Sequence, residues 1–286
     1  MRVSDCKIRR IYLVLFFAWA AAPGLLPRQA TSASAQKAEH VCMWNEAACQ
    51  RGNSVSIGVV ATDSDMSKLG SLHDVKELWF MVGPNRTGAA KISDVGFAHI
   101  QNLHDLEILD AMDLPLLTND ALLSLTKLRH LREARFEGDR NFSDAGLVHL
   151  QGLKTLQTIT FIGTPITDRG ILYLRESTDL QDLQIGQSLV TDAGAREIAA
   201  QFQNLKMLDL QGTKITNKGI ADIATLPHLE WLCLKNTSVT DSGLLALRSV
   251  STLRDLYIPS SAIHDQSITS LESSSPKLKV HRYGSE

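Results

Sequence analysis

Hydrophobic positions recur along this chain with a nearly constant spacing. From about residue 72, apolar residues follow a Leu-x-x-Leu-x-Leu pattern. The last two apolar positions of each copy are two residues apart, which places both side chains on one face of a β-strand. Each copy therefore predicts a short strand with one buried face. The eight triplets are Val75/Leu78/Phe80, Leu106/Leu109/Ala111, Leu131/Ala134/Phe136, Leu156/Ile159/Phe161, Leu180/Leu183/Ile185, Leu205/Leu208/Leu210, Leu229/Leu232/Leu234 and Leu253/Leu256/Ile258.

A second motif follows each triplet after a short turn rich in Gly, Asn, Thr and Ser. Its fullest copy, Ile-Thr-Asp-Arg-Gly, begins at Ile166. A fixed period in the twenties is the signature of a solenoid, in which each unit stacks only on its neighbours. The acid or amide of the motif recurs every 24 or 25 residues, at Asp94, Asn119, Asp144, Asp168, Asp192, Asn217, Asp241 and Asp265.

The residues of this second motif have separable roles. The aliphatic residue is buried in the core, and the Thr, or the acid beside it, caps the exposed N–H groups at the start of a short helix. The Gly lies in the first helical turn, where it disfavours a helix, so we interpret it as a point of close packing against the adjacent unit. Each helix spans about eight or nine residues and is held by stacking. The predicted fold is α/β: a curved stack with parallel strands on its concave face and short helices on its convex face.

These two motifs resemble the leucine-rich repeat superfamily over about residues 72–275. The resemblance is to the Ile-Thr-Asp-x-Gly-Leu subclass found in F-box-type ubiquitin-ligase receptors and in exported bacterial leucine-rich-repeat proteins. That subclass carries a buried Cys in the turn before the motif, whereas this chain has Thr164, Ser188, Thr213, Thr237 and Ser261 there. A hydroxyl can donate to a neighbouring unit's carbonyl in place of the thiol. The departure favours the exported bacterial type, and the resemblance implies protein binding without fixing a partner.

The first 35 residues have the pattern of an export signal. An apolar run at 11–22 is preceded by several basic residues and followed by small residues at 33–35. We predict cleavage after about Ala35 and an exported location, periplasmic, cell-surface or secreted. The alternative is that the run stays as an uncleaved membrane anchor, because Leu25 and Leu26 could extend it. Nothing later in the sequence is long and apolar enough to cross a bilayer.

The predicted organisation has four parts: a signal at 1–35, an N-terminal cap with a degenerate first repeat at 36–71, eight repeats at 72–275, and a C-terminal cap and tail at 276–286. In the first cap, residues 55–60 alternate like a strand and residues 63–69 can form one helical turn. Cys42 and Cys49 form a disulfide that staples this cap, or remain two free thiols. Residues 277–280 predict one last edge strand.

Composition and motifs exclude several function classes. A net charge of −2 over 286 residues gives no basic footprint for nucleic acid. No nucleophile elbow, phosphate loop or His/Cys ligand cluster is present, so we predict no enzyme activity, no cofactor and no metal. The recurrent acids could be read as a catalytic or calcium-binding ladder. Capping is the better interpretation because Asn119 and Asn217 occupy the same position in the motif.

The side chains predicted to leave the core on the strands give the concave face its character. It carries more acids than bases, so it would attract a basic partner, or the acids simply keep the inner sheet soluble. The acids are Glu77, Asp110, Glu133, Glu137, Asp182, Asp209 and Asp255, against Arg135 and Lys235.

Two apolar patches are predicted on the same face. The first comes from three consecutive units near the C-terminal end and has the composition of a binding hot spot, or is a cluster shielded by the C-terminal cap. Its residues are Met207, Asp209, Trp231, Cys233, Asp255 and Tyr257. The second, near the N-terminal end, comprises Trp79, Met81, Ile108 and Met112.

The sequence therefore predicts an exported, non-catalytic scaffold that binds another protein through the concave face. The acids of that face favour a partner with a basic surface. One alternative is a structural envelope component that self-associates. A second is a ligase-type substrate adaptor, which would require residence in the cytosol. We expect contact with a membrane only through an uncleaved signal.

Overall fold

The computed structural model describes residues 41–43, 48–81, 90–138, 141–259 and 263–282. All of them belong to one compact unit, Glu39–Glu286. The predicted signal at 1–35 lies outside the described residues, as does Ser261. Within the described part of the chain, no helix is long and apolar enough to span a bilayer.

The described strands form one twelve-stranded sheet in chain order. The first three pair antiparallel. All neighbouring pairs from β3 to β12 are parallel. The strands are β1 Val41–Met43, β2 Ala48–Arg51, β3 Ser54–Ile57, β4 Glu77–Phe80, β5 Ile108–Asp110, β6 Glu133–Glu137, β7 Thr158–Ile162, β8 Asp182–Gln184, β9 Met207–Asp209, β10 Trp231–Cys233, β11 Asp255–Ile258 and β12 Lys279–Arg282.

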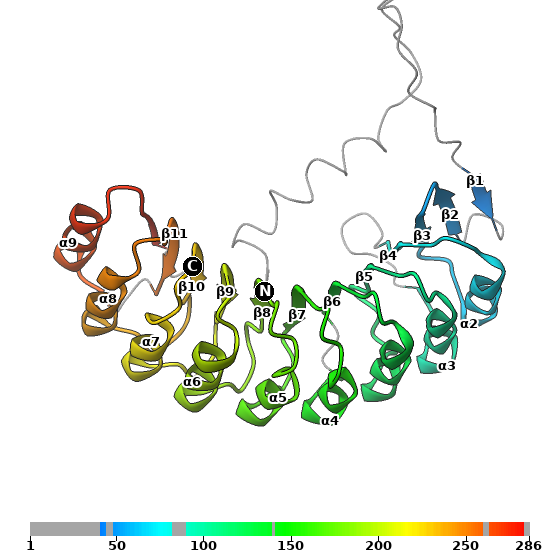
Figure 1. Ribbon diagram of the computed structural model, residues 1–286, viewed down its shortest axis with the longest axis horizontal. Coiled ribbons are helices and arrows are strands. Elements are labelled where there is room, and N and C mark those ends of the chain that lie inside the picture. Colours follow the sequence, from blue (N-terminus) through cyan, green and yellow to red (C-terminus); the bar gives the residue numbers. More distant parts are fainter. Residues whose placement is uncertain (1–40, 44–47, 82–89, 139–140, 260–262, 283–286) are drawn as a thin grey trace, which may run out of the picture. The chain divides into compact units, whose positions relative to one another are not determined.

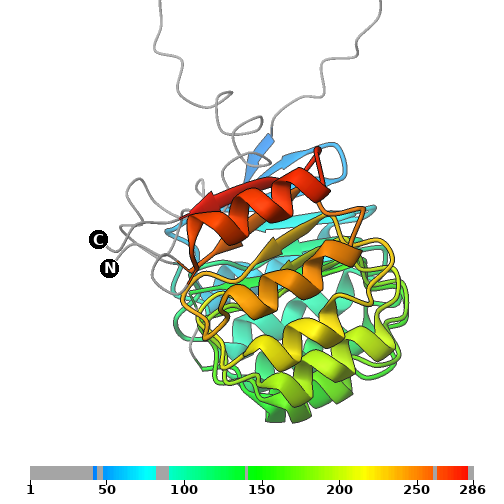
Figure 2. The ribbon, with the colours of Figure 1, turned by 90° about the vertical axis from the view of Figure 1, so that its left-hand side faces the viewer.

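Short helices cross over from each parallel strand to the next, on the outer side of the curved stack (Figure 1). Seen from one end, successive helices lie one beyond the other along the same side of the sheet, below the strands in this view (Figure 2). The predicted fold class is therefore confirmed. The helical segments are α2 Asp63–Met66, η1 Ser67–Ser71, α3 Asp94–Phe97, η3 Ala98–Asn102, η4 Asn119–Lys127, α4 Asp144–Leu147, η5 Val148–Leu150, α5 Asp168–Tyr173, α6 Asp192–Gln201, α7 Asn217–Ile223, α8 Asp241–Ala246, η6 Leu247–Ser249 and α9 Asp265–Ser274.

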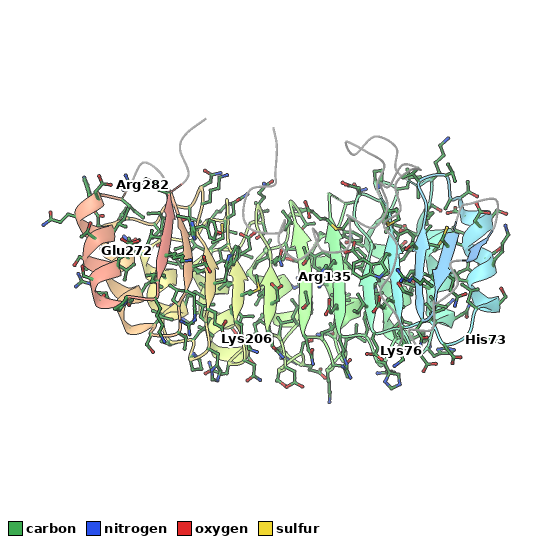
Figure 3. The ribbon with its side chains drawn as sticks, turned by 90° about the horizontal axis from the view of Figure 1, so that it is seen from above. His73, Lys76, Arg135, Lys206, Glu272 and Arg282 are labelled. Carbon is green, nitrogen blue, oxygen red and sulfur yellow. The ribbon has the colours of Figure 1, made fainter. Side chains whose placement is uncertain are left out.

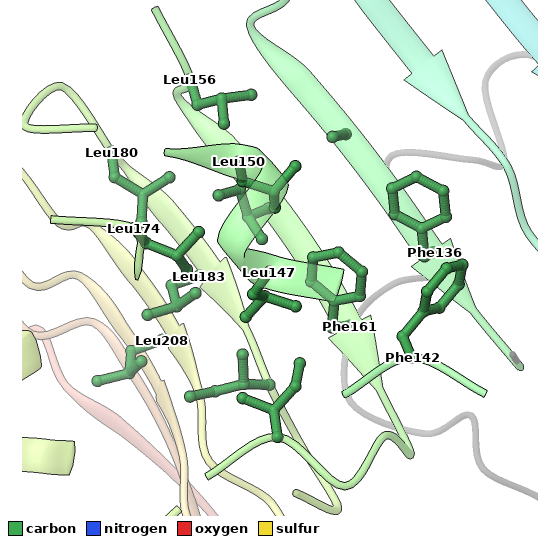
Figure 4. Close-up of a cluster of buried hydrophobic side chains, with 14 of the residues drawn as sticks. Phe136, Phe142, Leu147, Leu150, Leu156, Phe161, Leu174, Leu180, Leu183 and Leu208 are labelled. Atoms are coloured by element: carbon green, nitrogen blue, oxygen red, sulfur yellow. The ribbon is translucent and has the colours of Figure 1, made fainter. Parts of the chain in front are cut away.

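The predicted triplets form the core between the sheet and the helices. All of their side chains are buried. In the middle of the stack, Phe136 and Phe161 lie parallel with ring centroids 5.1 Å apart, and Phe142 packs against both edge-on (Figure 4). Burial of each large apolar side chain contributes roughly 1.5–3 kcal/mol. The core runs the length of the stack, as expected for a solenoid whose units bury their apolar face on one another.

From Asp94 to Asp241, each motif acid or amide bonds to the next unit. The Asp168 carboxylate accepts from the backbone N–H and the hydroxyl of Thr191, both at 2.7 Å, and from the backbone N–H of Gly194 at 3.0 Å. The Thr hydroxyl caps its own helix, as predicted: Thr191 accepts from the backbone N–H of Ala193. Of the two predicted capping groups, the Thr caps its own helix, and the acid reaches across the spacing between units and caps the following helix.

This ladder runs through the whole stack. Asp63 in the degenerate first repeat bonds to Ser93 in the same way. At the other end, Asp241 accepts from the backbone N–H of His264 and lies 2.6 Å from its ring Nδ1. The first repeat is therefore a true unit of the array, although its sequence departs from the motif.

The motif glycines lie against the acid or amide side chains that form this ladder. A Cβ added to Gly194 would lie 2.4 Å from Asp168 Oδ1, and one added to Gly170 would lie 2.5 Å from Asp144 Oδ1. The prediction that these glycines permit close packing between units is confirmed. Ala121 takes the Gly position in one unit, and that unit's helix, η4, is a 3-10 helix throughout.

The hydroxyls in the turns bond within their own units. Thr164 donates to the Phe161 carbonyl at 3.1 Å, and Thr213 and Thr237 likewise donate three residues back at 2.6 Å. Bonding to a neighbouring unit was expected, and that expectation is wrong, because the carbonyl at the end of the same strand lies within reach of a short side chain.

The two ends of the array differ. At the N-terminal end β1 and β2 form an antiparallel hairpin, which the polar sequence there did not predict. Its register sets Cys42 directly opposite Cys49, and Cys49 is disulfide-bonded. That Cys42 is the partner of Cys49 in this disulfide stays a prediction. At the C-terminal end, β12 adds the last parallel strand close to where the sequence places it.

Candidate functional site

The parallel register aligns outward-facing side chains into rows along the sheet (Figure 3). One row runs Glu77, Ile108, Glu133, Thr158, Asp182, Met207, Trp231, Asp255, Lys279. The next row runs Trp79, Asp110, Arg135, Thr160, Gln184, Asp209, Cys233, Tyr257, His281. These rows are the candidate binding surface, because they are the side chains that the strands turn away from the helices.

The structure brings the first predicted patch together. Trp231 is the register partner of both Met207 and Asp255, and its ring centroid lies 5.3 Å from that of Tyr257. Cys233 stands between Asp209 and Tyr257 in the second row. The six residues therefore form one continuous cluster on β9, β10 and β11.

Much of this patch is covered. Trp231 is 8% exposed and Tyr257 4%, and Cys233 is fully buried. From β12, His281 stacks on Tyr257 with ring centroids 4.4 Å apart and lies 2.9 Å from Asp255. This contact agrees with the alternative interpretation, in which the C-terminal cap shields the cluster. His281 was not among the predicted site residues, because its place one residue beyond the predicted edge strand was the only signal for it.

One polar atom of the patch is left without a partner. The Trp231 Nε1 donor is buried and makes no hydrogen bond within the described structure. A buried donor left unpaired costs about 1–3 kcal/mol. An acceptor supplied from outside would recover that cost.

The second predicted patch is also assembled, and it is more open. Trp79, Met81, Ile108 and Met112 are each partly exposed. The Trp79 indole N–H donates to Glu77 at 3.2 Å, and Glu77 is the register partner of Ile108. Because its indole is already bonded, this patch offers apolar area but no unsatisfied donor.

The acids of the concave face fall into two groups. Some have a basic partner: Glu133 is bonded to Arg135, and Asp255 to His281. In contrast, Asp182 accepts from the Gln184 amide, and Asp209 from the Gln211 backbone N–H at 2.8 Å. Burial raises the pKa of both Asp182 and Asp209 to about 6. Neighbouring carboxylates push these pKa values in the same direction.

No group of three or more His, Cys, Asp or Glu residues in the described part of the chain is arranged to hold a metal ion. A polar hollow of about 350 Å³ lies where the chain enters the first parallel strands, just before the start of the first row. An ion pair between Lys76 and Glu107, at 2.7 Å, crosses it. No sequence motif marks this hollow, so it was not predicted. It is lined by Asn53, Asp74, Lys76, Asp105, Glu107 and His130.

Comparison with known proteins identifies the fold. No family model matches the chain. No curated protein matches its sequence. Among solved structures, internalin C2 from Listeria monocytogenes is similar, with a TM-score of 0.56 and 23% sequence identity. The match covers 71% of this chain and 79% of that one. The architecture is thus that of a leucine-rich-repeat solenoid; at this identity the likeness concerns the fold.

Proposed function

We propose that this chain is an exported, non-catalytic scaffold that binds another protein through the concave face of its repeat array. The outward rows support this proposal, because a repeat array presents them as one extended surface, the kind that solenoids use for docking. The observation that carries it is the cluster around Trp231, in which aromatic rings are gathered beside acids and an indole N–H lacks an acceptor.

The cluster has the composition of a binding hot spot. Trp and Tyr dominate such sites because they supply large apolar area together with one polar handle. Met207 adds a flexible apolar side chain, while Asp209 and Asp255 would orient a partner. In this view the Trp231 indole N–H donates to an acceptor on the partner. The partner contacts the rings of Trp231 and Tyr257 next to the edge that His281 covers.

Affinity capture from the native envelope, followed by titration of the captured partner, tests this function. Trp231→Ala should weaken binding by about 2 kcal/mol or more, which is roughly 30-fold. Trp231→Phe should give a smaller loss, because it removes the N–H but keeps most of the ring area. Tyr173→Phe, on the helical side, is the matched control and should change nothing. An unchanged affinity for Trp231→Ala, with the fold intact by thermal melting, would refute the proposal.

The export part of the proposal rests on the sequence of residues 1–35. Sequencing the N-terminus of the native protein should find a start near Gln36, in a fraction outside the cytoplasm. A chain retained intact in the cytosol would instead favour the ligase-type adaptor.

A second candidate function, lateral self-association, is favoured by a different observation. Leu123, Val148 and Leu172 occupy the same position in three consecutive helices that contact one another. They are 55%, 36% and 41% exposed. Sedimentation at rising protein concentration tests this candidate. Association abolished by Leu172→Lys and unaffected by Trp231→Ala would favour it.

A further inference from the structure

Carboxylates outnumber cations in the middle of the concave sheet. Glu133 and Glu137 lie on β6, Asp182 on β8 and Asp209 on β9. Arg135 is the basic residue of β6, and it is bonded to Glu133. The field at this part of the surface is therefore negative, although the whole chain carries a net charge of only −2.

Two of these carboxylates are held by neutral groups. Asp182 is bonded by the Gln184 amide, and Asp209 by the Gln211 backbone N–H and the Cys233 thiol. The ion pairs of this face between described residues join Arg135 to Glu133 and His281 to Asp255, and neither pair includes Asp182 or Asp209. Burial raises the pKa of both carboxyls, and attraction from Arg135 at Asp182 and from Lys235 at Asp209 opposes that rise. Each has oxygen lone pairs left for a further donor.

A separate observation comes from the strand beside them. Thr160 lies on β7, 4% exposed, and its hydroxyl is buried without a hydrogen-bond partner. Its register partner is Gln184, which is in turn the register partner of Asp209. On the same pair of strands Thr158 faces Asp182. The unbonded hydroxyl therefore lies on the strand next to that of Asp182, and it shares a row with Asp209, with Gln184 between them.

The chemistry of this site selects a donor that carries positive charge. An ammonium group offers three N–H donors and a guanidinium five, and neither accepts hydrogen bonds. Carboxylates and a hydroxyl are the acceptors that such groups need. A bare metal ion fits less well, because no group of three metal-binding side chains is gathered in the described part. Nucleic acid would be repelled.

An extended protein segment suits the spacing of the surface. Neighbouring strands lie about 4.8 Å apart, and alternate residues of an extended chain lie about 6.6 Å apart. A segment crossing the strands can thus point one side chain at Asp182 and Asp209 while its neighbours rest on the adjoining rows. Asp209 also borders the Trp231 cluster, so one segment could reach both.

We propose that the Thr160–Asp182–Asp209 site binds a Lys or Arg side chain from an extended, basic segment of the partner protein. The inference rests on the proposed function, whose partner it describes more closely. A bound cation stabilises the charged carboxylates and displaces their protons. Binding should therefore strengthen from about pH 5 to about pH 7.5. The charged groups that face the two carboxylates are Glu133, Arg135, Glu137 and Lys235.

A synthetic peptide tests the site. The probe is a blocked peptide of about ten residues that alternates Lys and Ser, with a Glu-for-Lys peptide as its control. Titration calorimetry in two buffers of different ionisation enthalpy reports both affinity and proton release. The variants are Asp182→Asn with Asp209→Asn, and separately Thr160→Val. The matched control is Glu176→Gln with Asp179→Asn, which removes the same charge from exposed positions after α5.

The expected results separate the site from general attraction. The double Asn variant should bind the Lys peptide about tenfold or more weakly, and the control variant within about twofold of wild type. Thr160→Val should weaken binding about threefold, because it removes the hydroxyl acceptor. This substitution leaves the net charge unchanged. Proton release should accompany wild-type binding at about pH 6 and disappear in the double Asn variant.

Several outcomes would overturn the inference. The first is that the wild type does not bind the Lys peptide. The second is that the double Asn variant and the control variant lose equal affinity for it, and the third is that Thr160→Val binds it with unchanged affinity. If the captured partner binds the double Asn variant as tightly as wild type, this inference fails while the proposed function stands. If no protein partner is captured at all, the proposed function fails, whatever the peptide does.

Discussion

The Asp168 carboxylate accepts two hydrogen bonds from Thr191, which lies 23 residues further along the chain. The backbone N–H and the hydroxyl of Thr191 are the donors, each at 2.7 Å. A third donor, the backbone N–H of Gly194, meets the same carboxylate. Charge-assisted bonds of this kind are about twice as strong as neutral ones. Since the stability of a solenoid depends on the interfaces between neighbouring units, this contact should contribute strongly to the stability of the array.

Removing the side chain should be far worse than removing its charge. Asp168→Ala leaves three donors without an acceptor, and we expect a loss of about 2–4 kcal/mol in the free energy of unfolding. Asp168→Asn should cost about 1 kcal/mol, because Asn217 accepts from the Thr240 backbone N–H at 2.9 Å in the same geometry. Urea denaturation of the two variants measures the difference. Equal losses would show that the contact adds little.

The motif glycine should not tolerate a methyl group. In Gly194→Ala the new Cβ would lie 2.4 Å from Asp168 Oδ1 and 2.7 Å from Val190 Cγ1. We expect a loss of about 1–3 kcal/mol even though Ala is the better helix former. Gly70→Ala is the matched control, since its Cβ would meet only the Asn102 side chain, at an ordinary 3.6 Å. A melting temperature lowered equally in both variants would contradict this account.

Most of the fold could be predicted from the repeat period. Apolar spacing alone places each strand and its buried face, because a solenoid unit must bury the same positions in every copy. It also placed Trp231 beside Met207 and Tyr257, since parallel register follows from equal unit lengths. The direction of the Asp168 bonds did not follow, because it depends on the distance between units, which no pattern within one unit encodes.

Features outside the repeat could not be read from the sequence. The β1–β2 hairpin comes from a short polar segment with no alternation. The stacking of His281 on Tyr257 depends on how far β12 continues. The unpartnered Thr160 hydroxyl is invisible in sequence, because a Thr on the outer face of a strand is ordinarily bonded by water or a neighbour. A site that is marked by an unsatisfied hydrogen-bonding group can be recognised only in the folded structure.

Reduction should loosen the N-terminal end of the array. A disulfide between Cys42 and Cys49 closes a loop of about eight residues, for which chain entropy gives about 2.5 kcal/mol. Dithiothreitol should therefore lower the urea midpoint of the wild-type protein. The double variant Cys42→Ser with Cys49→Ser should start at that lower midpoint and show no further response. A wild-type midpoint indifferent to dithiothreitol would mean that the two residues act as free thiols.

The buried carboxylate of Asp209 should make the fold less stable as the pH rises from acid toward neutral. Burial raises its pKa from 3.8 to about 6, so between these values the folded state binds more protons than the unfolded state. Its contribution to the free energy of unfolding therefore falls through this window and stays low above it. At 1.36 kcal/mol per pH unit, the loss approaches about 3 kcal/mol.

An amide at this position cannot ionise, so Asp209→Asn isolates the effect. The stability difference between variant and wild type should be constant below about pH 4, grow in favour of the variant up to about pH 6, and then level off. The change with pH is the quantity to measure, because the amide's own hydrogen bonds add a constant offset. Asp179→Asn, at an exposed position, should give a flat difference across the same range. A flat profile for Asp209→Asn as well would mean that the folded chain leaves this carboxylate solvated, and that it is charged throughout.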